Sequence, residues 1–71
     1  MDLTEKAFSK NLKDIRTAKG YSQQAVADKL GIAVSTYANW EQGRTQPSIS
    51  DIIRLIGAFE IDANELFDIS N

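Results

Sequence analysis

Hydrophobic residues recur at steps of three and four positions along most of this chain, which is the spacing of an amphipathic α-helix. The first such run contains Phe8, Leu12 and Ile15, and Gly20 follows it. We therefore expect a first helix over residues 4–19, closed by this glycine. Segments that alternate hydrophobic and polar residues, as half-buried strands do, are absent from the sequence. The pattern predicts an all-α protein.

A second long run begins directly after Pro47, with Ser48 in a position suited to an N-cap and Asp51 in the first helical turn. We expect the helix that starts here to face the core through a stripe with i, i+3, i+4, i+7 spacing. That stripe consists of Ile49, Ile52, Ile53 and Ile56.

A short last helix follows, for which Asp62 and Glu65 have the spacing of a capping box. Ile61 precedes the cap and Leu66 lies five positions later, the spacing of a hydrophobic staple. These two signals predict one or two helical turns near the end of the chain.

The most informative stretch is residues 23–42, QQAVADKLGIAVSTYANWEQ. Ser22 is a good N-cap for a helix that Gly31 ends, because glycine adopts positive φ without a Cβ penalty. A second helix start is expected at Ala33, and Gly43 supplies the next stop. Two short helices joined by a glycine-centred turn predict a helix-turn-helix, whose second helix enters the DNA major groove.

Side chains of these two helices divide into an inner and an outer set. Ala27 lies on the inner side, where a small residue lets the helices cross closely. The space beneath is expected to be filled by Val26, Leu30, Tyr37 and Trp40. The outward residues of the second helix are expected to be Val34, Ser35, Thr36, Ala38 and Asn39. Short polar and methyl-bearing groups of this kind suit close approach to base edges and phosphates.

The stretch resembles the Cro and phage-repressor class of helix-turn-helix regulators, also called Xre-like, and the resemblance covers roughly residues 8–67. LKDIRTAKGYSQQAVADKLGI resembles the first two helices of that family, TYANWEQGR the recognition helix and its loop, and QPSISDIIRLIGAFEIDANELF the last two helices. The resemblance implies a single five-helix domain over residues 1–71, with the motif at about residues 22–42. One departure is Ala33, where the family more often has a serine or threonine cap.

Composition agrees with a small globular domain, at 71 residues with 42% hydrophobic and 25% charged. Cysteine and histidine are absent, so we expect no disulfide, no metal site and no cofactor. Neither a membrane-spanning stretch nor a signal-peptide pattern is present, and we expect a cytoplasmic protein.

The charge balance is the main objection to DNA binding, because a net charge of −2 is not the usual basic footprint. The total hides an asymmetry along the chain. Up to Arg44 there are seven Lys and Arg against five Asp and Glu, a net of +2, whereas one arginine and five acids beyond it give −4. We expect the acids to gather on the half that faces away from DNA, and binding to depend on dimerisation.

Val34 and Ser35 match the main base-reading positions of the family, and a thymine methyl is the natural partner for an exposed valine. Asn39 can read a purine edge or contact the backbone. Thr36 is a candidate for a phosphate contact.

In the family, a glutamine at the position of Gln23 binds a phosphate and braces the recognition helix; the alternative is a solvated side chain. Arg44 is the best phosphate contact by charge and position, and its alternative is a surface ion pair. A weak dimer interface is expected at Leu66, Phe67 and Ile69, although Leu66 and Phe67 can equally cap the core of their own chain.

An enzyme is not expected, because without histidine or cysteine no Ser/His arrangement can be built, and no catalytic residue is assigned. The sequence predicts a sequence-specific regulator of double-stranded DNA, more specifically a repressor that occludes a promoter as a homodimer on its operator. The alternative is a protein-interaction module of the same fold, such as an antitoxin or antirepressor.

Overall fold

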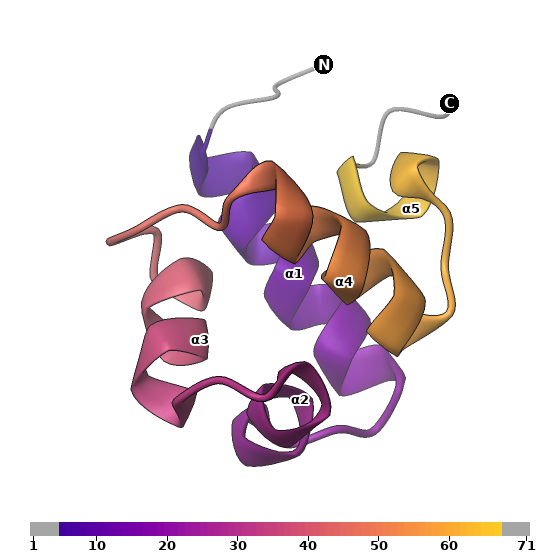
Figure 1. Cartoon of the computed structure of the whole chain (residues 1–71). Helices are drawn as coiled ribbons and strands as arrows, with labels where there is room; N and C mark the ends of the chain where they lie inside the picture. The colour runs from indigo at the N-terminus through magenta and orange to yellow at the C-terminus, as the bar shows by residue number, and fades with distance from the viewer. Residues whose placement is uncertain (1–4, 68–71) are drawn as a thin grey trace.

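The computed structural model describes residues 5–67 and folds them into five helices (Figure 1). The helices are α1 (Glu5–Ala18), α2 (Gln23–Leu30), α3 (Val34–Glu41), α4 (Ile49–Phe59) and α5 (Ala63–Phe67). The described part of the chain contains no strand. The prediction of an all-α, five-helix fold is confirmed.

Local signals in the sequence set the ends of α2. The Ser22 hydroxyl accepts a hydrogen bond from the Ala25 backbone N–H at 3.0 Å, which caps the start of the helix. Gly31 closes it in the left-handed conformation with φ 68°, and the next N–H, of Ile32, donates back to the Ala27 carbonyl at 3.0 Å. The turn between α2 and α3 is thus fixed by backbone geometry before any packing is considered.

The later helices begin as their sequences predict. Ser48 and Asp51 exchange two hydrogen bonds of 3.1 Å, each side chain accepting from the other residue's N–H, so α4 starts with a complete capping box. At α5, the Asp62 carboxylate accepts from the Glu65 N–H at 2.8 Å. These bonds satisfy N–H groups that the first turn of a helix leaves without an intrahelical partner.

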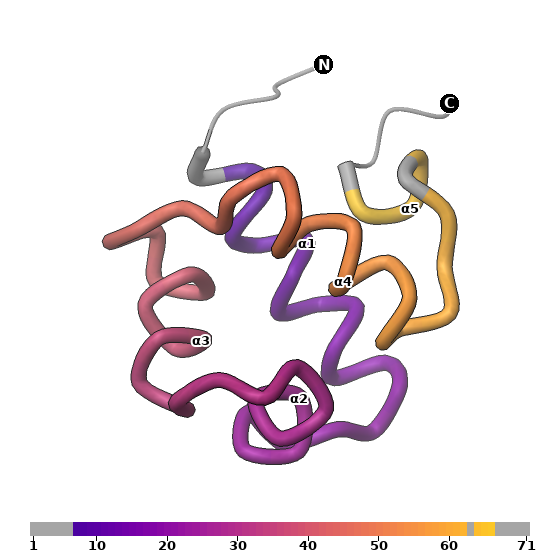
Figure 2. The backbone as a smooth tube through the Cα atoms, in the orientation of Figure 1, coloured from indigo at the N-terminus to yellow at the C-terminus, as the bar shows by residue number. Residues whose placement is uncertain are grey.

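Helix α1 is the long central element, and it packs against α3 and α5, while α2 packs against α3 and α4 (Figures 1 and 2). One hydrophobic core joins all five helices. Its buried members are Phe8, Leu12, Val26, Ala27, Leu30, Tyr37, Trp40, Leu55, Phe59 and Leu66. The inner set predicted for the two helices of the motif is therefore buried. No helix among residues 5–67 is long and apolar enough to cross a membrane.

The predicted core stripe of α4 is only half right, because Ile52 and Ile56 pack against the core and Ile49 and Ile53 do not. Leu55 and Phe59 face the core with 0% and 1% of their surface exposed, and Ile52 and Ile56 are only partly buried. The remaining members of the predicted stripe, Ile49 and Ile53, lie on the solvent side of the helix. The reason is that the apolar side of α4 is wider than the core covers, so steps of three and four do not show which edge of it is buried.

Candidate nucleic-acid interface

Helices α2 and α3 cross closely because the residue between them is small. Ala27 is fully buried at the crossing, where a larger side chain would force the helices apart. Beneath the crossing, the rings of Tyr37 and Trp40 pack edge to face with centroids 6.0 Å apart. Both aromatic residues are core residues, as predicted, and this packing fixes the outer side of α3 toward solvent.

The N-terminus of α3 is open to solvent and is not capped by a side chain. Ala33 is the N-cap, with φ −67° and ψ 142°, and makes no side-chain hydrogen bond to the helix. The first N–H groups of a helix have no intrahelical acceptor, and the helix dipole makes this end attractive to anions. Ser35 and Thr36 in this first turn are both exposed. A phosphate group can therefore approach these N–H groups and hydroxyls together.

Two predicted base-contact residues are less exposed than the sequence suggested. Val34 is half-buried and packs against the core, so its presence is not explained by contact with DNA alone. Asn39 is also half-buried, one turn further along α3. Both still lie on the helix that carries the exposed hydroxyls, but only part of each side chain is available to a base edge.

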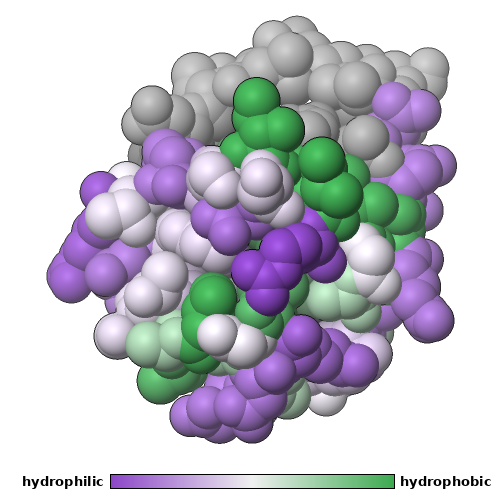
Figure 3. All heavy atoms as spheres, in the orientation of Figure 1, coloured by the Kyte–Doolittle hydropathy of each residue, from purple (hydrophilic) through white to green (hydrophobic). Residues whose placement is uncertain are grey.

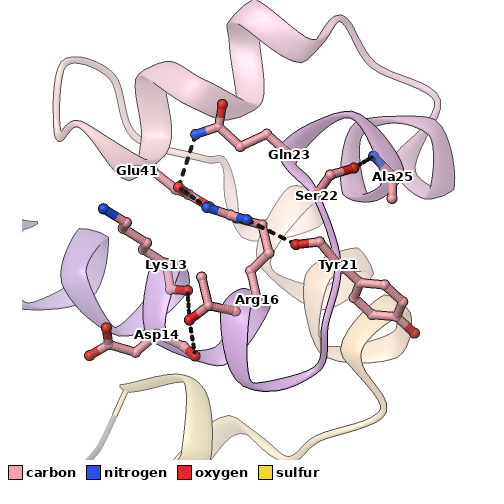
Figure 4. A network of polar contacts seen from close by, with 9 residues as sticks. Lys13, Asp14, Arg16, Tyr21, Ser22, Gln23, Ala25 and Glu41 are labelled. Atoms are coloured by element: carbon pink, nitrogen blue, oxygen red, sulfur yellow. Dashed lines mark hydrogen bonds and ion pairs between the residues drawn. The ribbon is translucent and has the colours of Figure 1, made fainter.

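A buried ion pair joins α3 to α1 (Figure 4). The Arg16 guanidinium donates from Nε to Glu41 Oε2 at 2.5 Å and from Nη2 to Oε1 at 3.1 Å. The side chains are only 12% and 3% exposed. Arg16 also donates from Nη1 to the Tyr21 carbonyl at 2.9 Å. One side chain therefore ties the end of α3 both to α1 and to the segment that leads into α2.

Gln23 takes part in the same cluster. Its amide Nε2 donates to Glu41 Oε1 at 3.0 Å, so a residue of the first turn of α2 reaches the last residue of α3 (Figure 4). This hydrogen bond joins Gln23 to α3, as the predicted bracing by Gln23 requires. The second N–H of the amide remains free to donate to a phosphate.

The electrostatics of the cluster favour the ionised pair. Burial by itself raises the pKa of Glu41, but the hydrogen bonds that it accepts, led by that from Arg16, outweigh burial and hold this pKa below its ordinary value. The hydrogen bond to Glu41 raises the pKa of Arg16. Burial also raises the pKa of the adjacent Tyr37 phenol, which stays neutral. The Tyr37 hydroxyl has no hydrogen-bond partner in the described part of the chain.

Arg44 lies in the loop after α3, which spans residues 42–48, and it is exposed. Its backbone N–H donates to the Asn39 carbonyl at 3.0 Å, and Gly43 before it has φ 73°. The loop also rests on α1, because a Cβ on this glycine would lie 3.3 Å from the Ser9 hydroxyl. Among the side chains that the structure describes, no carboxylate forms an ion pair with Arg44. The backbone hydrogen bond fixes the position of the residue at the end of α3, and its exposed guanidinium is free for a phosphate.

Lysines on α1 have ordinary surface roles. Lys10 forms an exposed ion pair with Asp14 at 2.9 Å, and Lys13 is exposed. Groups of three or more potential metal ligands are absent from the described residues.

The predicted dimer interface needs one correction. Leu66 is 0% exposed and belongs to the core, where α5 packs on α1, so it is not available to a second subunit. The Phe67 side chain and Ile69 lie outside what the structure describes, and their part of that prediction stays a prediction.

Sequence reasoning missed Arg16 as a partner of Glu41. A signal was present, because Arg16 stands four positions after Leu12 and eight after Phe8, on the buried face of α1. A charged residue at a core position of a helix indicates a buried partner. The sequence does not say which acid supplies it.

Comparison with known proteins agrees with this geometry. A helix-turn-helix family model matches residues 12–66, most of the chain. Similar curated proteins include the Bacillus subtilis SPbeta prophage-derived uncharacterized HTH-type transcriptional regulator YonR, 44% identical over 68% of this chain and 44% of its own length. The HTH-type transcriptional regulator AnsR of the same organism is 42% identical over 78% of this chain and 47% of its own length. The chain thus spans about half the length of these relatives.

Two further similar proteins align with more of the chain. The cryptic phage CTXphi transcriptional repressor RstR of Vibrio cholerae is 30% identical over 83% of this chain and 53% of its own length. The crystal structure of the restriction-modification controller protein C.AhdI from Aeromonas hydrophila superposes with a TM-score of 0.84. It is 35% identical and covers 89% of this chain and 96% of that one. The family resemblance seen in the sequence is confirmed. This chain belongs to the helix-turn-helix family of the Cro and phage-repressor type.

Proposed function

We propose that this protein is a sequence-specific, double-stranded DNA-binding regulator of transcription, and that it acts as a repressor by occluding a promoter. The observation that carries the proposal is the outer side of α3. At its start lie a helix N-terminus without a side-chain cap and the exposed Ser35 and Thr36, and the exposed Arg44 lies in the loop after its other end. The relatives named as transcriptional regulators and as a phage repressor support it.

In this proposal α3 enters the major groove as a rigid unit. Val34, Ser35 and Asn39 contact base edges. Gln23, Thr36 and Arg44 contact phosphates and set the register of the helix on the duplex. The ion pair between α1 and α3 and the Gln23 bond to α3 hold these groups in one arrangement before DNA is bound, which reduces the ordering cost of binding.

The proposed form on DNA is a homodimer over two half-sites about one helical turn apart. With a net charge of −2, one copy neutralises few phosphates, so two copies per operator are needed for tight binding. The proposal treats residues 1–71 as one helix-turn-helix domain, assigns no residue a catalytic role, requires no cofactor, and places the protein in the cytoplasm.

Selection of bound duplexes from a random-sequence pool tests this function. The expected product is a motif with two-fold symmetry and half-sites about 10 base pairs apart, bound with a steep dependence on salt. If no motif is enriched while the protein is shown to be folded, the DNA-binding proposal fails. The protein-interaction alternative then takes its place.

A further inference from the structure

Arg54 of α4 reaches across to the end of α2. Its Nη2 atom donates a hydrogen bond to the carbonyl of Leu30, which is the last residue of α2. A Cβ built on Gly31, the next residue, would lie 3.9 Å from the same Nη2 atom. The guanidinium of Arg54 therefore lies at the start of the turn that joins the two helices of the motif.

The Leu30 carbonyl needs a donor from outside its own helix. The last four carbonyls of a helix have no intrahelical donor, and the N–H groups of Gly31 and Ile32 donate to carbonyls earlier in α2. A positive charge at a helix C-terminus also interacts favourably with the helix dipole. Arg54 thus supplies both a hydrogen bond and a charge to this end of α2.

The surroundings of Arg54 leave it available for this role. It is the only Lys or Arg after Arg44 in the sequence, where five Asp and Glu are present. Its contact with Asp51, at an N–O distance of 3.9 Å, is too long for a hydrogen bond. The Arg54 side chain is 49% exposed, and Figure 3 shows hydrophilic side chains among apolar ones on the surface over α4. Water can therefore take its place, and its removal leaves no buried carbonyl without a partner.

The turn that Arg54 contacts leads directly into α3. Ala33, the N-cap of α3, follows Leu30 by three positions, and the exposed Ser35 and Thr36 belong to the first turn of α3. Helix α4 packs against α2, and α2 packs against α3. The buried ion pair with α1 holds the other end of α3. A shift of the turn therefore moves the first turn of α3 more than the last one.

We propose that Arg54 is a positioning residue for DNA recognition, which holds the turn between α2 and α3 and so sets the place of Ser35 and Thr36 on the duplex. In this proposal Arg54 does not contact DNA. The inference rests on the proposed DNA-binding function. Base contacts require close placement of the groups that make them, and base contacts specify sequence. Loss of Arg54 is therefore expected to reduce sequence preference and to leave non-specific binding unchanged.

Two variants of Arg54 and one control test this role. Arg54→Met and Arg54→Gln both keep residues that favour a helix, and both side chains are too short to reach the Leu30 carbonyl. Lys19→Met is the matched control for net charge, because Lys19 is exposed and follows the end of α1. The melting temperature of each variant establishes that it is folded under the conditions of the binding measurements.

Binding is measured to a selected operator duplex and to an unrelated duplex, over a range of salt concentrations. Both Arg54 variants are expected to bind the operator about tenfold more weakly than Lys19→Met does, which is the size of effect that one mismatched base pair causes. Their affinity for the unrelated duplex and their salt slope are expected to equal those of Lys19→Met. Equal operator affinity in the three folded variants overturns the inference. A salt slope lower by roughly 1 per subunit in the Arg54 variants also overturns it, because Arg54 would then be a phosphate contact.

NMR of the free protein tests the contact separately from DNA binding. The carbonyl carbon shift of Leu30 and the amide shifts of residues 31–36 are expected to change in both Arg54 variants and to stay the same in Lys19→Met. Shifts that are equal in all variants overturn the inference even where the original protein binds its operator. If the original protein binds no duplex with sequence preference, the proposed function fails, and changed shifts in the Arg54 variants still assign the turn to Arg54.

Discussion

Arg16 in α1 and Glu41 at the end of α3 form a two-bond ion pair with both side chains largely buried, across 25 positions of sequence. The pair joins the helix that anchors the core to the helix that carries the exposed polar face. Gln23 at the start of α2 donates to the same carboxylate. The orientation of the proposed recognition helix therefore depends on one acidic side chain with partners on two other helices.

Glu41→Gln is expected to lower the free energy of unfolding by about 3 kcal/mol, because it leaves the Arg16 charge buried without its counter-charge. Urea denaturation measures this change. Asp14→Asn is the control, since it breaks an exposed ion pair with Lys10 and is expected to cost less than about 1 kcal/mol. Equal losses in the two variants would show that burial of the Arg16–Glu41 pair does not increase its contribution to the free energy of unfolding.

The same pair predicts a pH dependence. The pKa of Glu41 is lower in the folded protein than its ordinary value of 4.5, so the pair contributes its full stability above that value and loses it as pH falls through the lower, folded pKa. The free energy of unfolding of the original protein is expected to decrease on acidification in this range. The curve for Glu41→Gln is expected to be flatter there, and parallel curves between pH 7 and pH 2 would contradict the assignment.

Two helix ends give opposite stability predictions. Glu60 closes α4 with φ 57°, a conformation that costs a non-glycine residue about 1 kcal/mol, so Glu60→Gly is expected to stabilise the protein by up to that amount. Gly31 closes α2 with φ 68°, and Gly31→Ala is expected to destabilise it by about 1 kcal/mol or more. Thermal unfolding of both variants tests the two predictions. Shifts of the melting temperature in the same direction would contradict the roles given to the two helix ends.

Arg44→Ala is expected to weaken binding to all duplexes about equally and to reduce the slope of log affinity against log salt concentration by roughly 1 per subunit. The reason is the loss of one phosphate contact from the loop after α3. Lys13→Ala removes an equal charge from the exposed side of α1 and is expected to leave the slope unchanged. A slope unaffected by Arg44→Ala would remove Arg44 from the interface.

Val34→Ala is expected to cost on the order of 1 kcal/mol of affinity and to relax preference at one base pair per half-site. Because Val34 also packs against the core, the free energy of unfolding is measured alongside binding. Loss of affinity that is uniform over all base substitutions at the site would show that Val34 supports α3 without reading a base.

Several parts of this structure were predictable because they depend on neighbouring residues. Ser22, Gly31 and the Ser48–Asp51 box act within one helical turn, so their spacing alone places the helix ends. The exposed face of α3 was predictable in outline for the same reason, once the turn fixed the register. The half-burial of Val34 depends on how α3 packs against the rest of the core, which spacing does not give.

Other parts depend on tertiary packing and were not predictable. Four isoleucines of α4 share a helical spacing, but Leu55 and Phe59 fill the core, and Ile49 and Ile53 are left outside. The partner of Arg16 is set by where α1 and α3 meet, and five acids precede Arg44 in the sequence. Hydrophobic spacing identifies the apolar side of a helix but does not show which part of it the core covers. The presence of a buried arginine does not show which distant acid is its partner.

We propose that DNA is contacted by the outer side of α3, the first turn of α2 and the loop after α3. Backbone amide chemical shifts measured by NMR during titration with a selected operator duplex test it directly. The largest changes are expected at Gln23, Ser35, Thr36, Asn39 and Arg44, with small changes along α5 and the exposed side of α1. Changes concentrated on α1 or α5, with α3 unaffected at saturation, would contradict the account.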